Sequence, residues 1–222
     1  MRALVCLSMI VSIAATATAA SAQQVTRMPD GAKNAVGIEG GFESAFIARA
    51  TYTRRIELGP IRDARLFGGF TLPVIAPDLS DWAINGGFQA TPWAYGNMRL
   101  ALAGGPVVRN TANSLFSATA VGISAAALFG YESPRWGLSA EIRHEQMFAT
   151  HLRHAAIYRD ITYPGAKDGW YSLTGSTTQA GLRGGVRVGA VEVAARVGYA
   201  ATGYIRPAMA PFFVTLGVSY AF

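Results

Sequence analysis

Cysteine is almost absent from this chain of 222 residues, and the single one, Cys6, lies in an apolar stretch near the N-terminus. Long apolar runs are also missing beyond residue 22, although a transmembrane helix needs about 20 apolar residues in succession. Charged residues make up only 14% of the chain. These absences exclude a disulfide framework and a helical membrane protein, so the stability of the chain must come from another source.

The first 22 residues have the features of a secretory signal peptide. Arg2 supplies the positive charge, residues 3–13 are apolar, and Ala20-Ser21-Ala22 forms a cleavage site of the A-x-A type. The apolar run is too short to cross a bilayer, which argues against a retained anchor helix. We therefore expect export through the Sec route and removal of residues 1–22.

The remainder is apolar on average but never over a long stretch. Hydrophobic residues account for 51% of the chain, and the mean hydropathy is +0.25. This combination is typical of a transmembrane β-barrel, in which lipid-facing residues alternate with lumen-facing ones. We expect residues 23–33 to be a flexible periplasmic tail and residues 34–222 to form one barrel domain.

Ten segments show the alternation of a β-strand, in which successive side chains point to opposite faces. They are residues 36–42, 47–56, 65–72, 82–90, 97–105, 116–131, 136–148, 177–188, 191–199 and 211–222. The predicted fold is all-β, a closed antiparallel up-and-down transmembrane barrel of ten strands. An eight-stranded barrel is the alternative if the first two segments, or the sixth and a neighbour, are misassigned. The alanine-rich middle of 116–131 can also be read as a helix.

Charge falls on one face of these segments. The residues predicted to point inward are Glu39, Glu43, Arg49, Arg55, Arg65, Arg99, Glu141, Arg143, Glu145, Arg183, Arg187, Glu192 and Arg196. An arginine facing lipid at mid-bilayer would cost about 2–4 kcal/mol, whereas a soluble sandwich would carry its charges outside. The charged face is therefore the enclosed one. The arginines are also scattered singly, which argues against nucleic-acid binding despite the net charge of +6.

The last twelve residues, PFFVTLGVSYAF, alternate strictly and end on an aromatic residue. They resemble the C-terminal β-signal of bacterial outer-membrane barrels, with Val218, Tyr220 and Phe222 at the signal positions. The resemblance is to this general class and implies a Gram-negative bacterium and an outer-membrane location. It also implies the barrel-assembly machinery, membrane lipid and lipopolysaccharide as partners, and it leaves the oligomeric state open.

The lumen supports two functional interpretations. Eight arginines and five glutamates facing into a narrow barrel should pair, because an unpaired charge away from water is costly. Paired throughout, they would make a packed and closed interior. If water fills the lumen instead, the excess of three positive charges (eight minus five) would make a narrow, porin-like passage that prefers anions.

A second candidate site lies where the seventh segment meets the long connection 149–174. Its residues are His144, His151, His154, Tyr158, Asp160, Asp168 and Trp170. His151 and His154 could bind a metal ion together with Asp160. Their spacing matches no known ligand motif, however, and we expect no cofactor. A membrane-embedded lipid-modifying hydrolase would need a histidine base and a hydroxyl nucleophile. The His-x-Ser-Asn element of lipid A deacylases is absent at His144-Glu145-Gln146, and the acidic and histidine pairs of omptin proteases have no match.

The connection also carries aromatic residues, Tyr163, Trp170 and Tyr171, in a turn-rich stretch. They are typical of an interfacial girdle or of a binding surface on an exposed loop. The sequence thus favours a structural or surface-binding barrel without enzymatic activity. A narrow anion-preferring pore is the alternative, followed by the hydrolase.

Overall fold

The computed structural model describes residues 28–29, 31–43, 45–59, 61, 63–74, 80–172, 175–202 and 211–222. Most of these residues lie in β-strands, as the alternation predicts. The elements are β1 (Asn34–Glu43), β2 (Phe46–Arg55), β3 (Arg65–Pro73), β4 (Trp82–Tyr95), β5 (Met98–Ala112), β6 (Phe116–Glu132), β7 (Trp136–His154), η1 (Tyr158–Thr162), β8 (Gly169–Tyr171), β9 (Ser176–Val188), β10 (Val191–Thr202) and β11 (Phe212–Ala221). η1 is a single π-helical turn. No helix among these elements is long and apolar enough to cross a membrane.

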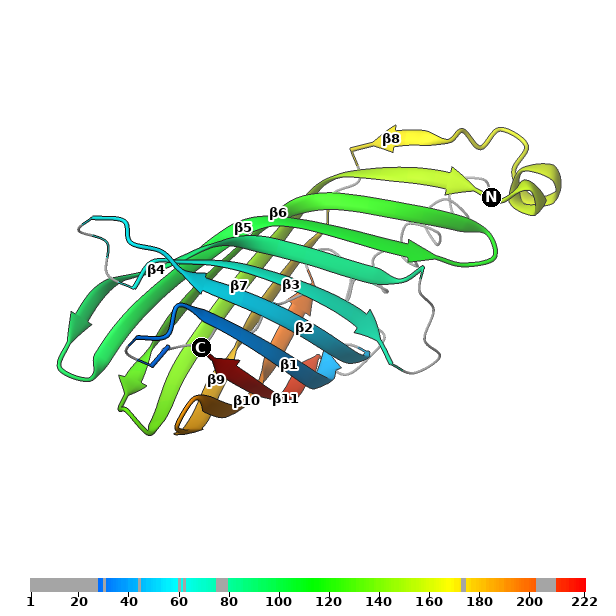
Figure 1. Ribbon diagram of the computed structural model, residues 1–222. Helices are drawn as coiled ribbons and strands as arrows, with labels where there is room; N and C mark the ends of the chain where they lie inside the picture. Colours follow the sequence, from blue (N-terminus) through cyan, green and yellow to red (C-terminus); the bar gives the residue numbers. More distant parts are fainter. Residues whose placement is uncertain are drawn as a thin grey trace.

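The strands close into a ring in which every neighbouring pair is antiparallel. β1 to β7 pair in sequence order, β7 then pairs with β9, and β9, β10 and β11 lead back to β1. β8 pairs with the end of β7 and lies outside the ring. The prediction of a closed ten-stranded barrel is therefore confirmed, and the eight-stranded alternative is wrong (Figure 1).

The two faces of each strand differ as the sequence predicts. On β1, Ile38 is 69% exposed on the outside while its neighbour Glu39 is only 4% exposed on the inside. On β11, Leu216 is 60% exposed and Thr215 is 2% exposed. The outside of the barrel is apolar, and the inside is polar and closely filled.

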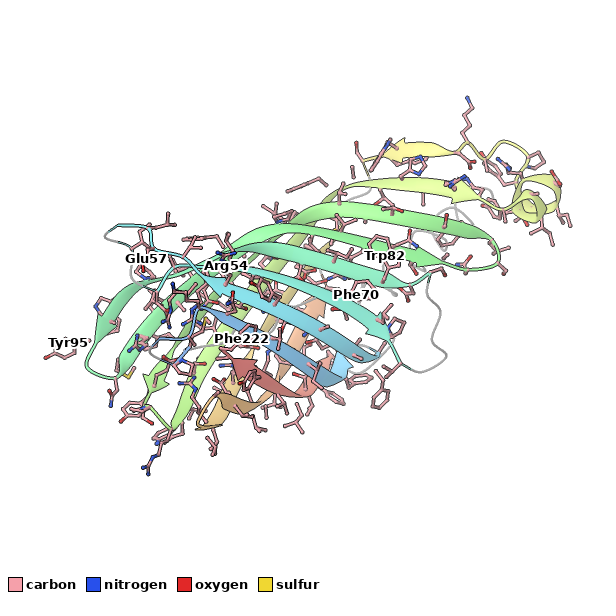
Figure 2. All side chains as sticks on the ribbon, viewed as in Figure 1. Arg54, Glu57, Phe70, Trp82, Tyr95 and Phe222 are labelled. Atoms are coloured by element: carbon pink, nitrogen blue, oxygen red, sulfur yellow. The ribbon has the colours of Figure 1, made fainter. Side chains whose placement is uncertain are left out.

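Aromatic side chains gather on the outer face near both ends of the barrel. Figure 2 shows Tyr95 and Phe222 towards the end where the chain terminates, and Phe70 and Trp82 towards the other end. Phe222 stacks on Tyr220 with ring centroids 6.0 Å apart. Two such girdles separated by aliphatic residues are typical of a barrel that spans a bilayer.

Two strand ends differ from the sequence prediction. The fourth predicted strand ended at residue 90, but β4 continues to Tyr95 because a bulge between Ala90 and Trp93 accommodates Pro92. A bulge allows this, since proline cannot donate to the strand ladder. The fifth predicted strand ended at residue 105. β5 continues to Ala112 because β6 pairs with it over that whole length.

The seventh strand shows the largest difference. The long connection was expected to begin at residue 149, yet β7 continues to His154, and β8 then adds to its edge. β5, β6 and β7 contain 15, 17 and 19 residues, against 10, 10 and 9 in β1, β2 and β3. The three longer strands and β8 therefore form a wall that extends past the shorter side of the barrel (Figure 1). The alanine-rich part of β6 is strand, so its helical interpretation is wrong.

Residues 1–27, which include the predicted signal peptide and the first part of the predicted tail, lie outside the described residues. The described end of that tail makes contacts with the barrel. Met28 is fully buried against Ala35 and Ala221 at the end of the lumen, and its carbonyl oxygen accepts a hydrogen bond from Arg55 Nη2 at 3.0 Å.

Glycine is required where β4 and β5 approach each other most closely. A Cβ atom on Gly105 would lie 2.1 Å from the carbonyl oxygen of Gly86 and 2.5 Å from the Cα atom of Gly87. A Cβ atom on Gly87 would in turn lie 2.1 Å from the carbonyl oxygen of Gly104. Both clashes are with backbone, which cannot move without disturbing the ladder.

We therefore expect Gly105→Ala to lower the free energy of unfolding by about 1–3 kcal/mol, as overpacking does elsewhere. Gly68→Ala is the matched control, because the nearest atom to a Cβ there is the carbonyl oxygen of Asn85 at 3.9 Å. Urea unfolding of the detergent-solubilised barrel measures the difference. Equal midpoints for the two variants would contradict this packing argument.

Candidate functional site

The inward positions of four strands bring five charged side chains together in the lumen. β1 supplies Glu39 and Glu43, β2 supplies Arg49, β7 supplies Glu141 and β10 supplies Arg196. All five are at most 8% exposed. We call this group the central ion-pair cluster.

Arg49 joins the two glutamates of β1. Its Nη1 donates to Glu39 Oε2 at 2.8 Å, its Nη2 donates to Glu43 Oε2 at 2.8 Å, and its Nε donates to the hydroxyl of Thr71 at 3.0 Å. Each guanidinium nitrogen thus has an acceptor. Burial of an arginine away from water is costly unless each of its N–H donors has an acceptor in this way.

Arg196 connects β10 to two strands with which β10 does not pair. Its Nη2 and Nε donate to Glu141 Oε1 at 2.7 and 2.9 Å, while its Nη1 donates to Glu43 Oε1 at 3.0 Å and to Glu39 Oε1 at 3.4 Å. The guanidinium also lies 5.1 Å from the ring centroid of Phe213. A single side chain of β10 is therefore bound to β1 and β7.

Further pairs fill the lumen on either side of this cluster. Towards the end where the chain terminates, Glu192 accepts from Arg183 at 2.7 Å and from Arg187 at 2.6 Å. Arg99 Nε lies 3.2 Å from Glu132 Oε2. The remaining pairs are Arg55 and Arg65 with Asp63 near the same end, and Arg109 with Glu145 towards the other end.

All thirteen residues predicted to face inward do so. Ten are buried, and Arg55, Arg99 and Arg187, which lie near the end where the chain terminates, are half-buried. The sequence reasoning missed Arg109, Glu132 and Asp63. Extending the alternation of the fifth segment by four residues would have found Arg109, and extending the sixth by one would have found Glu132. Asp63 lies outside any strand.

Little space is left between these side chains. One cavity is lined by Asn85, Ala103, Ser124 and Arg143, and another by Glu132, Ser139, Arg183 and Glu192. Each has room for about one or two water molecules. Within the described residues, the lumen is packed rather than open.

The three histidines of the second candidate site have different surroundings. His144 faces outward, with Nδ1 2.9 Å from the hydroxyl of Thr178. His151 meets the Trp170 ring of β8 edge to face at 5.2 Å. His154 stacks on the buried Tyr158 ring at 5.3 Å.

No group of three or more histidine, cysteine or carboxylate side chains in the described parts of the chain could hold a metal ion. Asp160 is exposed on η1, apart from the contacts of His151 and His154. The histidine and hydroxyl that do meet, His144 and Thr178, lie on the outer face of the barrel rather than in its lumen. Among the described residues, His144, His151 and His154 thus have three different sets of neighbours.

Asp168 holds the connection after β7 in place. Its Oδ1 accepts the backbone N–H of His154 at 2.8 Å and lies 3.1 Å from His154 Nδ1, and its Oδ2 accepts from Arg159 Nη1 at 3.1 Å. The hydrogen bonds from His154 keep the pKa of the Asp168 carboxyl below its ordinary value, and Arg159 adds to this. The contacts pin η1 and β8 to the end of β7.

The residues of the predicted assembly signal lie on the outer face of β11. Val218, Tyr220 and Phe222 are between 41% and 54% exposed. The carbonyl oxygen of Phe222 accepts hydrogen bonds from the backbone of Lys33 and Asn34, at 3.0 and 2.8 Å. The last residue thus closes the ring against the start of β1.

No protein-family model matches the chain, and no curated protein sequence matches it. Among solved structures, the outer membrane protease OmpT from Escherichia coli is similar with a TM-score of 0.50 and 9% identity, over 90% of this chain and 100% of that one. The β domain of the Bordetella autotransporter BrkA gives 0.40 and 14%, over 87% and 100%. The chain therefore has the fold of a bacterial outer-membrane β-barrel. At such identities the likeness concerns the fold alone.

We expect Arg196→Met to destabilise the barrel by about 3–5 kcal/mol, because it leaves three buried carboxylates with fewer partners. Arg54→Met is the matched control, since Arg54 is exposed at the end of β2 and makes no ion pair with any described residue. Urea unfolding in detergent gives both values. The double variant Arg196→Met, Glu141→Gln should recover part of the loss; no recovery would contradict the assigned pairing.

We expect Asp168→Ala to speed deuterium exchange at residues 169–171, because it removes the contacts that hold β8. In the wild type the contribution of Asp168 is present above its unfolded-state pKa, near 3.8, and is lost as pH falls through the lower folded-state pKa. Exchange, corrected for intrinsic rates, should thus be slow at pH 7 and faster at pH 3. Asp160→Ala, on the exposed side of η1, should change nothing; an equal effect would count against the assignment.

Proposed function

We propose that this chain is an integral protein of a bacterial outer membrane that acts as a closed scaffold for a surface-binding wall. The observation that supports this most is the packed lumen, in which buried arginines and glutamates pair and leave cavities the size of one or two waters. Such an interior makes the ring rigid and leaves little room for a solute. Recognition is then left to the wall that extends beyond the ring.

The proposed location rests on the fold and on the outer surface. The apolar exterior with aromatic girdles at both ends suits a bilayer, and the barrel fold is the one found in bacterial outer membranes. Val218, Tyr220 and Phe222 are exposed at the C-terminal end of β11, where the barrel-assembly machinery would bind them. Membrane lipid and lipopolysaccharide would surround the finished barrel.

A narrow anion-preferring pore is the second candidate. Its support is the excess of arginine in the lumen together with the small residues Ala103, Ser124 and Ala126, which line one of the water-sized cavities. A passage would have to form along this side of the lumen. It would require movement of the ion-paired side chains.

Planar-bilayer recording of the purified protein tests the closed scaffold. We expect no steady unitary conductance, with insertion verified by flotation of the protein with liposomes. A steady channel would overturn the proposal. If its anion preference also falls in Arg99→Glu and Arg183→Glu, the pore interpretation takes its place.

A further inference from the structure

The outer face of β7 carries an ionisable side chain within the apolar belt of the barrel. Trp136 is 50% exposed near the end where the chain terminates, and Phe148 is 50% exposed towards the other end. The stretch between them is long enough to cross the hydrocarbon, which takes about 9–11 residues of a tilted strand. His144 points outward within this stretch, two residues after Ile142, which is 52% exposed. Its imidazole therefore lies on the face that meets the lipid chains.

Only part of the hydrogen-bonding capacity of His144 is used. Its Nδ1 atom lies 2.9 Å from the hydroxyl of Thr178 on β9. Among the described residues, its Nε2 atom has no hydrogen-bond partner. A polar atom without a partner is costly in hydrocarbon, and ionisable groups at membrane depth are normally met by another protein group. The outer face of β7 therefore lacks a partner for His144 Nε2 when only lipid covers it.

The pair of His144 and Thr178 can supply either half of a further hydrogen bond. A neutral imidazole donates from one ring nitrogen and accepts at the other, while a hydroxyl can do both. When the Thr178 hydroxyl donates to Nδ1, the Nε2 atom carries the proton and donates. When Thr178 accepts from Nδ1–H, the Nε2 atom accepts. Two identical pairs that face each other therefore complete a hydrogen bond between their Nε2 atoms, with no other chemical group required.

The side chains around His144 are small enough for such an approach. Ala125 of β6 lies directly opposite His144, and Ala127 of β6 and Ala180 of β9 lie on either side of Ile142. Ala125 and Ala180 are exposed. Small side chains let membrane-spanning segments come close together, as they do between helices in membranes. The projecting side chains of β7 in one copy can thus lie against the alanines of another.

From this geometry we infer that two copies of the chain associate side by side in the membrane through the outer face of β6, β7 and β9. His144 of each copy is hydrogen-bonded to His144 of the other at a two-fold axis, so the same surface is used twice. The inference rests on the proposed membrane location. It does not depend on whether the lumen is closed.

Sedimentation equilibrium of the full chain in neutrally buoyant detergent tests the inference. We expect the wild type to dimerise, and His144→Phe to weaken the association at least about tenfold, because it keeps a ring but removes both nitrogens. His144→Gln should retain most of the association, since an amide also donates and accepts. Tyr52→Phe is the matched control: it removes an outward hydroxyl that bonds to Asn34, from β2 on the opposite side of the ring. It should associate as the wild type does.

Disulfide trapping in liposomes tests the position of the axis. Each variant carries Cys6→Ser, so that the introduced cysteine is the only one. On oxidation, His144→Cys should give a linked dimer, whereas Ala50→Cys, which is outward on β2, should not. A monomeric wild type, equal linkage at the two positions, or unchanged association of His144→Phe would each overturn the inference. Unfolding midpoints in urea confirm that the variants are folded.

The two proposals fail separately. A channel in planar bilayers would overturn the closed scaffold while leaving the association measured in detergent intact. Association that does not depend on His144 would overturn the dimer contact while the barrel stays silent in the bilayer.

Discussion

Pairing of buried charge is the constraint on which the rest of the structure depends. An apolar exterior forces the polar residues of every strand inward, and a ring of ten strands is narrow enough that long side chains there lose water. Arg196 meets Glu39, Glu43 and Glu141 at once, and Arg49 shares two of these carboxylates. The cluster ties β1, β2, β7 and β10 together, so the shape of the ring and the closure of its lumen have the same origin.

The molecule has two parts whose side chains have different surroundings. The lumen stabilises the ring, whereas the wall of β5 to β8 extends past it and presents side chains to the surroundings (Figure 1). Asp168 belongs to the second part, because its contacts with His154 and Arg159 hold β8 at the edge of β7.

Prediction from the sequence worked best where a single rule was sufficient. Alternation assigned Glu39, Arg49 and Arg196 to the lumen, since the side-chain period of a strand is two and one face must meet lipid. Prediction failed where a bulge admitted a proline into a strand, and where no residue type marks the end of a strand. The fourth strand was predicted to stop at residue 90, before Pro92, although a bulge accommodates this proline within β4. Arg109 was missed because nothing in the sequence marks where a strand ends.

The sequence alone determined the barrel and the face on which its charges lie, because both follow from local alternation and from the cost of charge in lipid. The pairing of the strands then decided for ten strands over eight. Only the tertiary structure decided which charges pair, since Glu141 and Arg196 are 55 residues apart and meet because β7 and β10 both pair with β9. The tertiary structure also decided which groups the three histidines contact. His144, His151 and His154 lie close in sequence, yet a bulge and the added strand β8 turn them to separate partners, Thr178, Trp170 and Asp168. Register and bulges set those directions, and neither can be read from composition or spacing.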